Sequence, residues 1–263
     1  MQSDSNILKI DNLSKYFGGL AAVSNCSLKI KKGTITGIIG PNGSGKTTLF
    51  NLIAGNLKSS GGTVLFNNEN ITNVPAYELF SKGLLRTFQI AHEFTNLTVL
   101  ENLMMVPGNQ SGEKLVNVML KPGLIKKEEE QVRRKAYEVI EFLNLKHLAN
   151  ELAGNLSGGQ KKLLELGRTM MVDAKLVLLD EVGAGVNRTL LKEIGTSIQR
   201  LNKEKGYTFC MIEHDMDFIG RLCDPVIVMA EGSVLFEGSV EDAKKDEKVI
   251  ESYLGRGSKL KDN

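Results

Sequence analysis

The stretch that most constrains what this chain can fold into is GPNGSGKTT at residues 40–48, which matches the phosphate-binding pattern G-x-x-x-x-G-K-[ST] at every fixed position. An apolar, β-branched run precedes it at residues 34–39, and residues 46–54 carry apolar side chains at helical spacing. The sequence therefore predicts a strand, a glycine-rich turn and a helix, the context that the pattern requires. A glycine-rich turn without a ligand is the alternative, and Lys46 and Thr47 in register with the glycines disfavour it.

The residue types in this loop suit a phosphate group. Glycines allow successive backbone N–H groups to point into one concave nest, and the helix N-terminus adds a positive partial charge. The Lys46 side chain would reach the β- and γ-phosphates, and the Thr47 hydroxyl would coordinate Mg²⁺. We therefore assign these residues to nucleotide binding: Asn42, Gly43, Ser44, Gly45, Lys46, Thr47 and Thr48.

Composition excludes several other classes of protein. The 263 residues include 33 Lys and Arg against 31 Asp and Glu, so no basic surface for nucleic acid is indicated. Cys26, Cys210 and Cys223 show no C-x-x-C spacing and are interpreted as buried apolar residues in a reducing compartment. Neither a signal peptide nor an apolar run long enough to span a membrane is present, which predicts a soluble intracellular protein.

The order of the predicted elements indicates an α/β protein with a helical insertion. An antiparallel β portion and the strand that feeds the phosphate loop precede residue 90, and residues 90–156 are predicted to be helical. Alternation of helices and strands resumes at residues 157–238, and a charged helical extension with a frayed end follows at 239–263. The predicted nucleotide-binding core thus comprises 7–89 and 157–238.

Two carboxylates follow a fully apolar strand at residues 176–179. Strands of this kind are buried on both faces, and ligands bind beyond their carboxyl ends. Asp180 could hold hydrated Mg²⁺ beside the phosphate loop, and Glu181 could orient and deprotonate an attacking water. An ordinary strand end could carry the same acids, but their combination with the phosphate loop favours a site for nucleotide hydrolysis.

A second candidate anion site is Leu156-Ser157-Gly158-Gly159-Gln160, where two glycines and a serine precede a predicted helix. A plain N-cap is the alternative interpretation. Here the sequence resembles the ATP-binding cassette family, whose signature motif is this same L-S-G-G-Q. The resemblance covers residues 7–254, with the motifs in the family's order.

The resemblance implies the fold of a P-loop ATPase: a RecA-like core, an antiparallel β subdomain and an inserted helical subdomain. It implies ATP and Mg²⁺ as cofactors, Phe17 as the aromatic residue that stacks on adenine, and Val23 as a further residue of the nucleotide site; core packing is the alternative for Phe17. Gln89 matches the glutamine that senses Mg²⁺, and His214 matches the histidine that contacts the γ-phosphate. The signature residues would contact a second nucleotide: Ser157, Gly158, Gly159 and Gln160.

The sequence departs from the general family pattern just after Glu181. Val182 stands where the family often has proline, and Asn187 stands where it often has aspartate. Cassettes of branched-chain amino-acid uptake systems commonly have this asparagine, so Asn187 resembles a mark of that subgroup. The resemblance therefore implies uptake of branched-chain amino acids or a related small polar solute. A cassette for lipopolysaccharide-type export and an ATP-gated clamp without transport are the alternatives.

The partners are implied in the same way. They are transmembrane permease subunits, a second cassette that is identical or paralogous, and an extracytoplasmic solute-binding protein, with no nucleic acid. The chain would lie in the cytoplasm against the inner face of the cell membrane. We expect residues 89–103 to contact the permease, with Glu93 and Glu101 on that surface.

Overall fold

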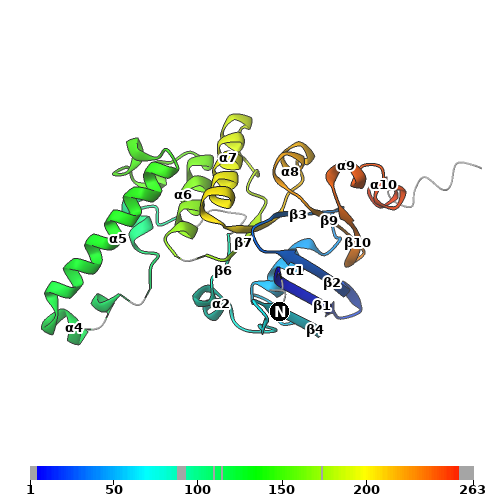
Figure 1. Cartoon of the computed structure of the whole chain (residues 1–263), viewed down its shortest axis with the longest axis horizontal. Coiled ribbons are helices and arrows are strands. Elements are labelled where there is room, and N and C mark those ends of the chain that lie inside the picture. The colour runs from blue at the N-terminus through cyan, green and yellow to red at the C-terminus, as the bar shows by residue number, and fades with distance from the viewer. Residues whose placement is uncertain (1–4, 88–92, 109, 114, 173, 255–263) are drawn as a thin grey trace, which may run out of the picture. The chain divides into compact units, whose positions relative to one another are not determined.

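The computed structural model describes residues 5–87, 93–108, 110–113, 115–172 and 174–254. They form two compact units (Figure 1): a core unit of Met1–Arg86, Lys175–Gly183 and Ile198–Asn263, and a helical unit of Thr87–Ala174 and Ala184–Ser197. Contacts thus group residues 157–174 and 184–197 with the helical unit, whereas the sequence analysis placed both segments in the core. Gln89 lies outside the described residues.

The core unit contains a six-stranded sheet in the order β10-β9-β3-β8-β7-β6. Strands β6, β7, β8, β3 and β9 run parallel to their neighbours, and β10 closes the edge as an antiparallel hairpin with β9. The bounds are β3 (Ile35–Ile39), β6 (Leu84–Arg86), β7 (Leu176–Asp180), β8 (Thr208–Ile212), β9 (Val226–Ala230) and β10 (Ser233–Gly238). The buried strand before the phosphate loop and the buried strand before the two carboxylates confirm the predicted α/β core.

Burial explains why the central strands are almost wholly apolar. Every residue of β3, β7 and β8 is buried, as expected for parallel strands with both faces covered. Because these three strands are adjacent and parallel, the segments that follow them emerge at one edge of the sheet. That edge therefore gathers the phosphate loop, the Asp180–Glu181 pair and His214.

A second, antiparallel sheet in the core unit has the order β2-β1-β4-β5. Its strands are β1 (Asn6–Phe17), β2 (Leu20–Lys31), β4 (Gly61–Phe66) and β5 (Glu69–Asn70). The sequence is strand-like only at 7–10 and 27–30, and the apolar alternation breaks near Asn12 and Asn25. Both asparagines adopt positive φ, and the pairing register shifts beside them, so irregular pairing interrupts the pattern without ending either strand.

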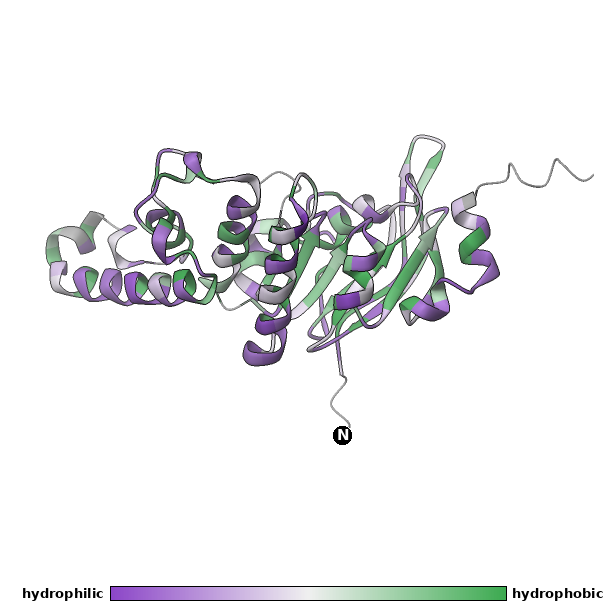
Figure 2. Cartoon of the chain, turned by 90° about the horizontal axis from the view of Figure 1, so that it is seen from above, coloured by the Kyte–Doolittle hydropathy of each residue, from purple (hydrophilic) through white to green (hydrophobic). Residues whose placement is uncertain are grey.

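Helix α1 (Lys46–Ile53) packs within one apolar cluster that contains side chains from both sheets. Its buried residues include Leu49, Phe50 and Ile53, and Figure 2 shows the strands of the core mainly in the hydrophobic colour. The other core helices are α2 (Ala76–Lys82), α8 (Met216–Leu222), α9 (Val240–Ala243) and α10 (Glu247–Leu254), with the C-terminal part of α7 (Arg188–Lys205). The three cysteines are free and buried, as predicted, and burial raises the pKa of the Cys26 thiol to about 11.

The helical unit contains α3 (Val99–Met104), α4 (Leu115–Leu120), α5 (Pro122–Phe142), α6 (Gly158–Met170) and the first part of α7. Helix α5 begins with Pro122 in its first turn, a favourable position for proline. Its apolar stripe is a packing face, since Ala136, Val139 and Ile140 are buried. Within the described part of the chain, no helix combines the length and apolar character needed to cross a membrane.

Candidate functional site

The loop between β3 and α1 needs glycine at two positions for steric reasons. Gly40 has a φ of +147°, and a Cβ atom there would lie 2.1 Å from the backbone oxygen of Met229. Gly45 has a φ of +98°, and a Cβ there would lie 2.4 Å from the backbone oxygen of Ala22. Neighbouring backbone therefore lies too close to the loop for a side chain at either position, so these glycines allow the path that the loop takes.

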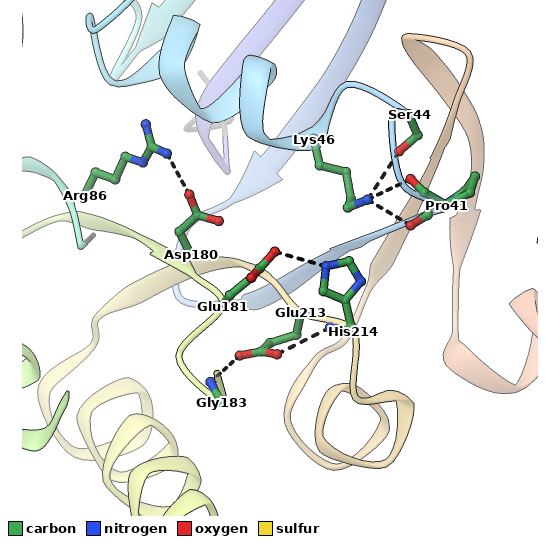
Figure 3. Close-up of polar contacts among 10 residues, drawn as sticks. Pro41, Ser44, Lys46, Arg86, Asp180, Glu181, Gly183, Glu213 and His214 are labelled. Carbon is green, nitrogen blue, oxygen red and sulfur yellow. Dashed lines mark hydrogen bonds and ion pairs between the residues drawn. The ribbon is translucent and has the colours of Figure 1, made fainter. Parts of the chain in front are cut away.

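Lys46, the first residue of α1, is held inside the curve of the loop. Its Nζ atom donates hydrogen bonds to the backbone oxygens of Gly40, at 2.8 Å, and Pro41, at 2.9 Å (Figure 3). Burial lowers the pKa of the ammonium group, and the negative charge of Glu181 partly opposes that shift. The ammonium is therefore held in place at the positive end of a helix, ready to contact an anionic group.

A pocket of about 360 Å³ opens in front of this loop. Among the described residues, its lining comes from the core unit and consists of Phe17, Leu20, Ala21, Ala22, Asn42, Gly43, Gly45, Lys46, Thr47, Thr48, Glu181 and His214. The structure thus brings together most of the residues that the sequence analysis assigned to nucleotide binding and catalysis. It adds Leu20, Ala21 and Ala22, which the hairpin of β1 and β2 brings to the pocket.

Phe17 lies at the pocket with 47% of its surface exposed, so the core-packing alternative does not describe its environment. The Lys15 Nζ atom is 5.1 Å from the centre of its ring. Val23 is placed differently: it is fully buried in the apolar cluster, behind Gly45, and is not among the residues that line the pocket. A Cβ atom added at Gly45 would lie 3.5 Å from Cγ2 of Val23, so this side chain packs beside the loop. Ser44 is also buried, and its Oγ lies 3.4 Å from Lys46 Nζ.

Glu181 and His214 meet across the carboxyl edge of the sheet (Figure 3). The Nε2 atom of His214 is 3.0 Å from Oε1 of Glu181. Glu181 has a φ of 47°, in the left-handed region that L residues other than asparagine and aspartate seldom adopt. Strain of this kind at the end of a buried strand persists where the surroundings fix it, and it commonly marks functional positions.

Glu213 is a buried residue at this edge of the sheet that the sequence analysis did not select. Its carboxylate is buried and accepts hydrogen bonds from the backbone N–H of Gly183, at 2.7 Å, and of His214, at 3.3 Å. Desolvation raises its pKa, and these two hydrogen bonds oppose the shift. Glu213 therefore ties the turn after Glu181 to the segment that carries His214. An acidic residue directly after the apolar strand β8 was the available signal.

Asp180 lies at the buried end of β7 and forms an ion pair with Arg86. An oxygen-rich set comprising Thr47, Asp180 and nucleotide phosphates would suit Mg²⁺, which prefers one or two carboxylates with phosphate oxygens to a cage made only of protein. The residues present therefore fit a metal that arrives with a nucleotide.

The signature residues 157–160 belong to the helical unit. Ser157 caps α6 in a capping box: its Oγ accepts from Gln160 N, and Gln160 Oε1 accepts from Ser157 N at 2.9 Å. Position 159 requires glycine for a steric reason, because a Cβ atom there would lie 1.9 Å from the side chain of Leu190 on α7. The N-cap interpretation is thus correct for the local structure, while Ser157 and Gly158 remain exposed at the helix N-terminus.

The residues that depart from the family pattern have clear places in the structure. Val182 is buried beside the strained Glu181. Asn187 accepts a hydrogen bond from Leu190 N at 3.0 Å and so caps the start of α7. Aspartate could make the same cap, so the cap itself does not explain the choice of asparagine.

Comparison with known proteins agrees with this geometry. The family model described as ABC transporter matches residues 23–184. A probable branched-chain amino acid transport ATP-binding protein, LivG of Archaeoglobus fulgidus, is 45% identical over 95% of this chain and 95% of its own length. The crystal structure of a nucleotide-free ATP-binding cassette from an ABC transporter is 42% identical, with a TM-score of 0.82 over 95% of this chain and 100% of that one.

A more distant solved structure is a dimeric ATP-binding cassette in a post-hydrolysis state, bound to ADP and Pi. It is 26% identical, with a TM-score of 0.72 over 89% of this chain and 98% of its own. The family model covers more than half of this chain, and the relatives cover nearly all of it. The chain therefore belongs to the ABC transporter family, as one of its ATP-binding, ATPase subunits.

Proposed function

We propose that this chain binds MgATP in the pocket between the phosphate loop and Glu181, hydrolyses it, and thereby powers uptake of branched-chain amino acids or a related small polar solute. The observation that carries the proposal is the meeting of Lys46, Glu181 and His214 around one pocket that Phe17 flanks. The name of the LivG relative supports the choice of solute. Permease subunits would supply the membrane path, and the chain would lie on the inner face of the membrane.

The geometry suggests a division of roles in hydrolysis. The loop amides and Lys46 would hold the phosphates, and Mg²⁺, when bound near Thr47 and Asp180, would neutralise charge on the β- and γ-phosphates. Glu181 would orient a water and accept its proton as the water oxygen bonds to the γ-phosphorus and the bond to the ADP oxygen breaks. His214, which contacts Glu181 here, would find an additional acceptor in a γ-phosphate oxygen.

Loss of Lys46 should weaken nucleotide binding itself. We expect Lys46→Ala to bind ADP and ATP at least about tenfold less tightly, because a hydrogen bond from a charged group to phosphate is lost. The same change leaves the backbone oxygens of Gly40 and Pro41 without their donor, so the melting temperature should also fall. Equilibrium titration with a fluorescent nucleotide would measure the affinity. Lys248→Ala, at an exposed position on α10, is the control, and native affinity in Lys46→Ala would contradict the role.

A second cassette would give the exposed Ser157 a nucleotide to contact. Ser157 and Gly158 present a helix N-terminus suited to phosphate, yet they belong to the helical unit and not to the pocket lining described above. A head-to-tail dimer would place Ser157–Gln160 of one cassette against the nucleotide of the other, with two equivalent sites. The dimeric cassette bound to ADP and Pi supports this arrangement.

The contact with the permease should involve the segment before α3, but neither Glu93 nor Glu101, which the sequence analysis selected, is a good probe of it. The Glu93 side chain is 8% exposed and pairs with Lys161 Nζ at 2.6 Å, so reversing its charge would damage the helical unit. Glu101 forms a capping box with Thr98, so its replacement would disturb the start of α3 as well as the surface. Phe94 is the better candidate: it is 48% exposed, and its backbone is held by the buried side chain of Asn102.

We expect Phe94→Glu to lose co-purification with the permease subunits and to abolish transport, because an exposed aromatic side chain with a hydrogen-bonded backbone is a typical anchor at an interface. ATP binding by the isolated chain should stay native. Tyr137→Glu on α5, another exposed aromatic residue of the helical unit, is the matched control. If Phe94→Glu transported normally, the docking surface would have to lie elsewhere.

Identification of the co-purifying membrane subunits, followed by solute uptake in vesicles, would test the proposed transport directly. ATP-dependent uptake of branched-chain amino acids, aided by an extracytoplasmic solute-binding protein, would support it. Subunits of an export system would favour the lipopolysaccharide-type alternative. Full ATPase activity with no membrane partner would favour a clamp without transport.

A further inference from the structure

Arg86, the last residue of β6, lies against the carboxylate that the proposed function assigns to Mg²⁺. Its Nη2 atom is 2.6 Å from Oδ2 of Asp180, and its Nη1 atom donates to Oδ1 of Asn51 on α1. The guanidinium carbon lies 6.0 Å from the centre of the Phe50 ring. Figure 3 shows the Arg86–Asp180 pair on the side of Glu181 away from His214.

This pair is buried, with side-chain exposures of 11% for Arg86 and 5% for Asp180. A buried carboxylate without a cation nearby is strongly destabilising, so Arg86 supplies the charge that Asp180 needs. Only one oxygen of Asp180 is in the ion pair. Arg86 in turn is incompletely bound, since its buried Nε atom has no hydrogen-bond partner within the described part of the chain.

We propose that Arg86 is the resident counter-cation of Asp180, and that it competes with the nucleotide's Mg²⁺ for this carboxylate. The inference rests on the proposed function, because it presumes that Asp180 faces the metal. Two cations that share one buried carboxylate repel each other at short range. Arg86 therefore stabilises the site when no metal is bound. It also lowers the affinity of the site for the metal, which favours release of MgADP.

The rival explanation is that Arg86 has only a structural role. Arg86 links β6, α1 and β7 through Asn51, Phe50 and Asp180, and its loss could simply loosen the core. The two explanations predict opposite changes in metal affinity when Arg86 is replaced. Loosening the site can only weaken metal binding, whereas removal of a competing cation strengthens it.

The test compares ADP affinity with and without metal in wild type, Arg86→Gln and Arg86→Lys. The ratio of the ADP dissociation constant in EDTA to that in saturating Mg²⁺ measures the metal's contribution, and general damage to the nucleotide pocket cancels from it. We expect Arg86→Gln to raise this ratio about tenfold, because one positive charge near the metal is removed. Arg86→Lys, which keeps the charge, should stay near wild type.

Melting temperature provides the second readout. Without metal, Arg86→Gln should melt below wild type, and MgADP should stabilise it by a larger increment. Lys82→Gln is the control, since Lys82 is a basic residue of the same unit whose partner, Glu69, lies at the exposed surface. A ratio that falls or stays unchanged in Arg86→Gln would overturn the inference. Failure of the wild-type chain to bind ADP under either condition would instead overturn the proposed function.

Discussion

Glu181→Gln should bind MgATP as tightly as wild type and hydrolyse it at least about 10²-fold more slowly, the low end of what a general base contributes. Glutamine keeps the size of the side chain and one oxygen that His214 Nε2 can contact, at a position where the wild-type distance is 3.0 Å. It removes the ability to take a proton from water. Binding by titration and single-turnover hydrolysis would separate the two effects.

The matched control is Glu237→Gln on β10, which removes an exposed carboxylate of the core unit away from the pocket lining. It should hydrolyse ATP at the wild-type rate. Near-native turnover by Glu181→Gln would show that the base has been assigned to the wrong residue. Loss of ATP binding in this variant would instead assign Glu181 to the binding of the phosphates.

The features that could be predicted from sequence depend on residues close together in the chain. The phosphate loop lies between a buried strand and α1, and the cap of α6 joins Ser157 to Gln160, only three residues on. Such local patterns can be recognised within a short stretch of sequence, without knowledge of contacts elsewhere in the fold. The pairing of β9 with β10 around Glu231 and Gly232 is equally local.

The features that were missed depend on contacts between distant residues. Arg86 is 94 residues from Asp180, and Gly183 is 30 residues from Glu213, so neither pairing leaves a pattern in a short window. The full length of β1 and β2 was hidden by positive φ at Asn12 and Asn25. The burial of Glu93 and its pairing with Lys161 were also invisible, because a charged residue in a loop is ordinarily exposed.

The second large effect concerns assembly. In the Glu181→Gln background, ATP should accumulate between two chains, because hydrolysis no longer removes the γ-phosphate that both would contact. Adding Ser157→Arg would place a bulky side chain where the partner's γ-phosphate must lie. We therefore expect the double variant to lose the ATP-dependent dimer and to keep ATP binding as a monomer.

Ser157→Arg also removes an N-cap from α6, which costs about 1 kcal/mol of stability. Ser239→Arg is the matched control, since Ser239 caps α9 in the core unit by accepting from Asp242 N at 3.0 Å. Both substitutions lose a serine cap, but only the one at Ser157 should affect the dimer. Equal melting temperatures of the two variants would exclude unfolding as the cause of a lost dimer.

Size-exclusion chromatography with light scattering, run with and without MgATP, tests most directly whether the pocket is half of a site shared between two cassettes. The account predicts a monomer without nucleotide, a dimer of Glu181→Gln with MgATP, and a monomer again once Ser157→Arg is added. A dimer that forms without ATP, or one that is indifferent to Ser157→Arg, would contradict the shared site.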